Sequence, residues 1–97
     1  MPKVKRYTIS QLRSVIRPIA TECNVSEAYF LKKDSKPNSD RFVELVYNLN
    51  PWATSDDLHT FERTLYKKFP DQIVLTGVHS SSFIMQEARE NGKPLFN

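Results

Sequence analysis

The sequence predicts an α+β domain with a small mixed sheet whose helices pack mainly on one face. Three observations predict this class. The 97 residues provide for one hydrophobic core, apolar residues recur at helical spacing in two long segments, and short apolar and aromatic runs separate those segments. Helices that alternate with strands bury their apolar stripes against a sheet. We therefore expect residues 1–97 to form one domain in the order helix, strand, loop, strand, helix, strand, helix.

Charge, hydropathy and cysteine content indicate the kind of partner and the cellular compartment. The 14 basic and 11 acidic residues leave a net charge of +3, which is weak evidence for a polyanion partner. The cluster Lys3, Lys5 and Arg6 could contact phosphates, although solvated terminal charges are the better interpretation. No apolar run approaches the roughly 20 residues that cross a bilayer, and the N-terminus lacks the apolar stretch of a signal peptide. With Cys23 as the one cysteine, we expect a cytoplasmic protein without an internal disulfide or a membrane partner.

The first helix begins at a capping-box pattern. Thr8 and Gln11 have the T-x-x-Q spacing at which the two side chains satisfy the first backbone amides of a helix. One apolar stripe follows at helical spacing and contains Leu12, Val15, Ile16, Ile19 and Cys23. Pro18 lies inside this stripe and removes a backbone hydrogen bond at a cost of about 3 kcal/mol. We therefore expect a kink or an early end near Arg17, followed by a looser turn.

Two short strands follow, joined by a charged loop that contains no glycine. Residues 27–31 are rich in aromatics and predict the first strand. Residues 42–47 predict the second, and five of these six residues are apolar or aromatic, which is typical of a strand buried on both faces. The exception is Glu44. A carboxylate in such a strand is paired, lies at the rim of the sheet or is functional.

The next segment predicts a loop and a second helix. Residues 48–53 form the loop, and we expect Trp52 to cover one end of the core. Hydroxyl caps at Thr54 or Ser55 start the helix, which carries an apolar stripe and ends before Pro70. The stripe consists of Leu58, Phe61, Leu65 and Phe69.

The C-terminal part predicts one more strand and one more helix. Residues 72–76 form the third strand, which ends at Gly77. Serines at 80–82 can cap a last helix that runs to about residue 89, with Ile84 and Ala88 facing inward. The segment 93–97 is expected to add a short edge strand.

Several phrases resemble one known family over nearly the whole chain. These are QLRSVIRPIA, AYFL, VELVYNLNP, SDDLHTFERTLYKKFPDQIVLTG and ENGKPLF. They are similar to the minimal nucleotidyltransferases of the DNA polymerase β superfamily. The chain looks most like the stand-alone bacterial and archaeal domains that are often paired with helical HEPN-type proteins. The resemblance implies a nucleotidyltransferase-like fold.

The chemistry of that family needs residues that this chain does not have. A Gly-Ser loop lets the backbone approach a triphosphate, and three carboxylates hold two magnesium ions that align the attacking hydroxyl. In this sequence Lys32 and Lys33 fall at the glycine and the serine. Phe42, Glu44 and Val74 fall at the first, second and third carboxylates. The resemblance therefore implies a degenerate site with no catalytic residues and no metal, and Mg²⁺ would be a cofactor only if residual activity existed.

A different register does not restore the site. If Asp40 were the first carboxylate, Phe42 would become the second. Asp40 and Glu44 lie four strand residues apart, about 13 Å, which is too far for both to bind one magnesium ion. Phe42 therefore occupies a catalytic position in either register.

Other polar residues have simpler interpretations. Glu44 is a relic ligand or pairs with Lys32 or Lys33, and pairing is favoured. Together with Lys36, these two lysines could attract a phosphate without metal. His59 and His79 have no partner at metal-site spacing and are expected on the surface, and Cys23 is expected to be a half-buried apolar side chain.

Three functions remain open. The favoured one is a regulatory, antitoxin-like module that binds a helical HEPN-type protein or itself through its helices and through Trp52, Phe96 or Tyr7. The second is a metal-independent binder of nucleotides or nucleic acid that uses the lysine loop, and the third is an active nucleotidyltransferase with unusual ligands. The fold would then be kept for binding.

Overall fold

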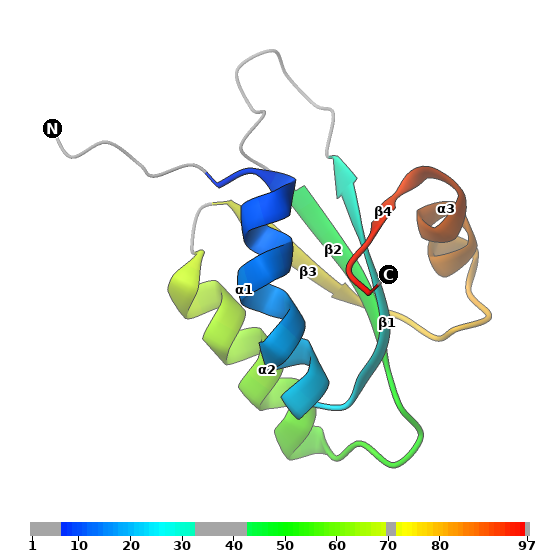
Figure 1. Ribbon diagram of the computed structural model, residues 1–97. Coiled ribbons are helices and arrows are strands. Elements are labelled where there is room, and N and C mark those ends of the chain that lie inside the picture. The colour runs from blue at the N-terminus through cyan, green and yellow to red at the C-terminus, as the bar shows by residue number, and fades with distance from the viewer. Residues whose placement is uncertain (1–6, 33–42, 70–71, 97) are drawn as a thin grey trace, which may run out of the picture.

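The computed structural model describes residues 7–32, 43–69 and 72–96 and contains three helices and four strands (Figure 1). Their bounds are α1 Ile9–Glu22, β1 Val25–Lys32, β2 Val43–Leu49, α2 Ser55–Lys68, β3 Ile73–Gly77, α3 Phe83–Asn91 and β4 Lys93–Pro94. The predicted α+β class and the order of the elements are confirmed. The short edge strand expected near the C-terminus is β4, which pairs with β1.

The sheet is mixed and has the strand order β3-β2-β1-β4. β1 is antiparallel to both β2 and β4, whereas β2 and β3 are parallel and are connected through α2. The register places Leu31 of β1 and Val74 of β3 on either side of Glu44 in β2. Because side chains alternate between the two faces of a sheet, Glu44 and Val46 lie on one face, and Leu45 and Tyr47 on the other.

Helices α1 and α2 lie side by side over the face that carries Leu45 and Tyr47 (Figure 1). The two helices contribute the apolar side chains at the centre of this core, Leu12, Ile16, Phe61 and Leu65, all of which are fully buried. In α2 the predicted stripe is confirmed, with Leu58 partly buried and the other three members buried. This face therefore contains most of the buried apolar surface.

Helix α3 covers part of the opposite face. Its side chains Met85 and Ala88 are fully buried against Val46 of β2. The prediction that Ile84 faces inward is wrong, because Ile84 is 45% exposed. The helix begins at its Ser82 cap with a rotation that turns Met85 toward the sheet. The helices thus lie mainly on one face, with α3 as the exception.

Helix α1 begins as predicted and continues further than expected. Thr8 caps it, and the capping box with Gln11 is present. The expected early end near Arg17 is wrong, since α1 runs through Pro18 to Glu22. Pro18 cannot donate to the carbonyl of Ser14, but Ser14 lies on the exposed side of the helix, where water can serve that carbonyl.

Trp52 lies outside the core. Its side chain is 69% exposed, so the prediction that it covers one end of the core is wrong. The indole Nε1 donates a hydrogen bond to Oδ1 of Asn24 at 3.2 Å, and Asn24 in turn donates to Asp57 at 3.0 Å. Asn24 has a positive φ of 61°, a conformation that asparagine tolerates after a helix end.

No helix in the described ranges is long and apolar enough to cross a membrane.

Candidate functional site

The site expected from the family resemblance falls on the sheet face opposite α1 and α2. Glu44 lies in the central strand β2 and is partly exposed. Its direct neighbours across the strands are Leu31 and Val74, both partly exposed. The positions compared with the second and third carboxylates of the family are therefore adjacent, and here they hold one acid and one valine.

Glu44 has a hydroxyl partner on the next strand. Thr76 Oγ1 donates a hydrogen bond to Glu44 Oε2 at 2.7 Å. Thr76 lies two residues after Val74 on β3, so both point to the same face as Glu44. No sequence pattern indicates this contact, because it depends on the parallel register of β2 and β3.

Of Lys32, Lys33 and Lys36, the three lysines suggested for phosphate binding, the structure describes only the backbone of Lys32. The backbone of Lys32 pairs with Val43, so the residue directly opposite Glu44 is Leu31 and not a lysine. The predicted ion pair of Glu44 with Lys32 or Lys33 involves side chains outside the described residues. Lys36 and Phe42 also lie outside them.

The described residues do not gather into a metal centre. No group of three or more His, Cys, Asp or Glu side chains in these ranges could hold a metal ion. His59 and His79 are both exposed, as predicted. A single carboxylate with a threonine hydroxyl offers fewer oxygen ligands than a magnesium ion usually takes from protein and substrate.

Helix α3 is fixed beside this site by an ion pair. Arg89 donates to both carboxylate oxygens of Glu27 in β1, at 3.0 and 2.7 Å. The Tyr29 hydroxyl also bonds Glu27 at 3.3 Å. The hydrogen bonds to Glu27 raise the pKa of the Arg89 guanidinium. The ion pair holds α3 in a defined position on the sheet.

A buried tyrosine on the other face was missed by the sequence analysis. Tyr47 is fully buried, and its hydroxyl donates a 2.5 Å hydrogen bond to Glu62 of α2. Burial, followed by the bond to Glu62, raises the pKa of the Tyr47 phenol. A Cβ at Gly77 would approach the Tyr47 hydroxyl to 3.1 Å, so glycine leaves room for the phenol. This pair links α2 to β2 and is structural.

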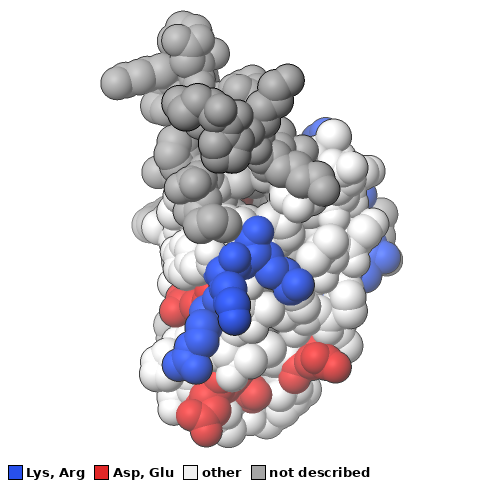
Figure 2. All heavy atoms as spheres, turned by 90° about the vertical axis from the view of Figure 1, so that its left-hand side faces the viewer, with Lys and Arg blue, Asp and Glu red and all other residues white. Residues whose placement is uncertain are grey.

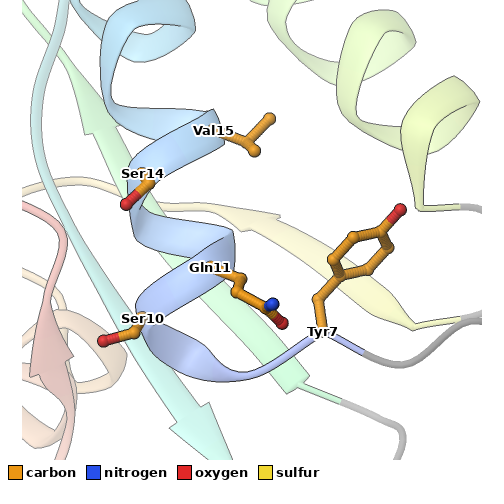
Figure 3. Close-up of a pocket in the computed structure, with 5 residues that line it drawn as sticks. All are labelled: Tyr7, Ser10, Gln11, Ser14 and Val15. Atoms are coloured by element: carbon orange, nitrogen blue, oxygen red, sulfur yellow. The ribbon is translucent and has the colours of Figure 1, made fainter.

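A shallow groove runs along α1. Tyr7, Ser10, Gln11, Ser14 and Val15 line it, and Figure 3 shows Tyr7 and Val15 extending to the same side of the helix. Gln11 is already used in the capping box, and Tyr7 packs edge-on against Phe69. Its lining residues within the described ranges carry hydroxyl and amide groups but no charged side chain, so these five residues supply no reactive group.

Cys23 is not a reactive nucleophile. It is 5% exposed, and burial raises the pKa of its thiol, with smaller contributions from Asp57 and Glu22. A raised pKa reduces the thiolate that would react. The prediction of an apolar role is supported, although the side chain is more deeply buried than expected.

Exposed apolar side chains occur on three elements besides α1. Phe83 and Ile84 of α3 are 87% and 45% exposed, and Trp52 and Tyr66 are also exposed. Of the residues that the sequence suggested for binding, only Trp52 is exposed, because Tyr7 and Phe96 are half-buried. The sequence analysis missed Phe83, since its exposure follows from the rotation of α3.

The chain matches no family model, no curated protein sequence and no solved structure. The resemblance to nucleotidyltransferases therefore rests on the sequence phrases alone.

Proposed function

We propose that this chain is a catalytically degenerate nucleotidyltransferase-like domain that acts as a cytoplasmic protein-interaction or regulatory module, of the antitoxin-like kind. We propose the nucleotidyltransferase-like fold on the same basis. The candidate partners are a helical HEPN-type protein and a second copy of the chain. Neither metal nor nucleotide is needed for this role.

One observation carries the proposal: Glu44 stands between two apolar residues. Two-metal phosphoryl transfer requires several carboxylates around the ions, whereas Leu31 and Val74 flank Glu44 here. Thr76 donates a hydrogen bond to one carboxylate oxygen of Glu44. Exposed apolar side chains on α3 and in the 50–54 loop supply surface for binding a protein instead.

A second candidate function is a metal-independent binder of nucleotides or nucleic acid. It would use Lys32, Lys33 and Lys36, which place positive charge where the family has its phosphate loop. An active nucleotidyltransferase is the weakest of the three candidates, because it would need ligands other than those of the family.

Titration of the purified chain with ATP and magnesium tests the proposal. We expect no magnesium-dependent heat of binding by calorimetry, and no difference between the wild type, Glu44→Ala and the exposed control Glu22→Ala. Micromolar magnesium-dependent binding that is lost only in Glu44→Ala would refute it. Magnesium-independent binding that is lost in a Lys32→Ala/Lys33→Ala variant and weakens steeply with salt would favour the second candidate.

The interaction itself is tested by co-expression with the protein encoded beside this one. Co-elution at a fixed stoichiometry, unaffected by ATP and magnesium, is the expected result. If neither a heterocomplex nor self-association is found for the full-length chain, the binding role is wrong.

A further inference from the structure

The outer stripe of α3 combines apolar and acidic side chains. Phe83, Glu87 and Glu90 recur at helical spacing, and all three are exposed. They lie on the side of the helix opposite the buried Met85 and Ala88, so the stripe points away from the sheet. Arg89 does not neutralise it, because that guanidinium is bound to Glu27. A phenylalanine that is 87% exposed on a fixed helix is costly in water unless something covers it.

The outer face of α2 is basic. Figure 2 turns the α2 side of the molecule toward the viewer and shows Lys and Arg side chains gathered in one stripe. The exposed cations of α2 are Arg63, Lys67 and Lys68, which form no ion pair within the described part of the chain. Arg63 and Lys67, four residues apart, lie on the same side of the helix. Tyr66, 42% exposed, adds an aromatic surface next to them. Three free cations beside an exposed ring favour an anionic partner with an apolar group.

The two stripes carry opposite charges at similar spacings. Arg63 and Lys67 are separated by four residues, about 6 Å along the helix, and Glu87 and Glu90 by three, about 4.5 Å. Two ion pairs can therefore form at once between an α2 and an α3 that lie side by side. Within one chain this is impossible, because α2 covers one face of the sheet and α3 the other. A second copy brings the complementary stripe.

We propose that copies of this chain associate head to tail, with the α3 stripe of one copy on the basic face of α2 of the next. This deepens the proposed binding role by naming a second copy as the partner. Because the interface uses two different surfaces, it can repeat to form rings or short chains. The helices are short, so the contact buries less than the roughly 800 Å² per partner of a stable dimer, and the association is weak and depends on concentration.

Charge reversal tests the pairing directly. Sedimentation of the full chain at rising concentration should show an increasing average mass at about 50 mM salt and a monomer at about 500 mM, where screening is strong. Arg63→Glu/Lys67→Glu and Glu87→Lys/Glu90→Lys should each be monomeric alone, since their two stripes now have the same sign. Mixing the two variants should restore association, because each stripe again meets one of opposite charge.

The contribution of the apolar side chain Phe83 to association is tested separately, with its own control variant. Phe83→Ser should weaken association about tenfold or more, whereas Val15→Ser, which removes an exposed apolar side chain from α1, should leave it unchanged. The proposal fails if the wild type is monomeric at millimolar concentration in low salt, or if the reversed variants associate alone. It also fails if the basic stripe binds DNA or RNA while the chain stays monomeric. None of these readouts involves ATP or magnesium, so this failure is separate from failure of the nucleotide test above.

Discussion

The two faces of the sheet differ in what covers them and in how strictly their side chains are constrained. Under α1 and α2, Leu45 and Tyr47 are fully buried within a large apolar cluster. On the other face, Val46 packs on two residues of α3, while Glu44 stays half-exposed beside Val74. The first face specifies the fold. The second leaves Glu44 and Val74 partly exposed, so we expect it to constrain its side chains less strictly.

The largest effect is expected under α2. Phe61→Ala removes a fully buried ring that packs edge-on against Tyr47, and it should lower the free energy of unfolding by about 3–5 kcal/mol. Urea denaturation measures this loss. The exposed neighbour His59→Ala on the same helix should change stability by less than about 0.5 kcal/mol. A loss below about 1 kcal/mol for Phe61→Ala would contradict the assignment of this face as the main core.

On the α3 side the corresponding change should cost less. Met85→Ala leaves a gap in a cluster that has two other fully buried members among the described residues, so we expect a loss of about 2 kcal/mol, the low end for such a substitution. Hydrogen exchange should show that amide protection is lost mainly in α3. Ile84→Ala is the matched control and should have little effect, because that side chain is exposed. If Met85→Ala and Phe61→Ala lowered the free energy of unfolding equally, the two faces of the sheet would not differ in how much they stabilise the fold.

The Tyr47–Glu62 pair adds a pH-dependent term to the covered face. Tyr47→Phe should cost about 1–2 kcal/mol at neutral pH, because the buried hydrogen bond is lost. The folded state raises the pKa of Tyr47 above its unfolded value of about 10. The phenol therefore stabilises the fold fully below about pH 10, and this stability is lost as the pH rises further, because the unfolded chain releases the proton more easily.

Urea denaturation between neutral pH and about pH 11 checks this sign. The stability advantage of the wild type over Tyr47→Phe should shrink at the alkaline end. Glu62→Gln, which keeps an acceptor for the hydroxyl, should cost less than Tyr47→Phe at neutral pH. A difference between wild type and Tyr47→Phe that does not change with pH would show that the phenol has an ordinary pKa.

Sequence patterns predicted the covered face well and the open face poorly, for physical reasons. The caps at Thr8 and Thr54 and the stripe of α2 depend on local chemistry and were found. Of the two residues of α3 that were predicted to face inward, Ala88 is buried and Ile84 is not, because a nine-residue helix with mixed polarity does not fix its own rotation. The bond between Thr76 and Glu44 joins residues that are 32 positions apart and needs the strand register.

The smallest effect is expected at the candidate site itself. Glu44→Val places a third apolar side chain between Leu31 and Val74, and Thr76 is exposed enough to bond water once its acceptor is gone. Lost hydrogen bonding and gained apolar contact then nearly cancel, so stability should change by less than about 1 kcal/mol. Denaturation of Glu44→Val, of Thr76→Val and of the double variant measures this balance, and the double variant separates the pair energy. A loss above about 2 kcal/mol for Glu44→Val would mean that the carboxylate is required for the fold, and its presence between two apolar residues would then need no functional explanation.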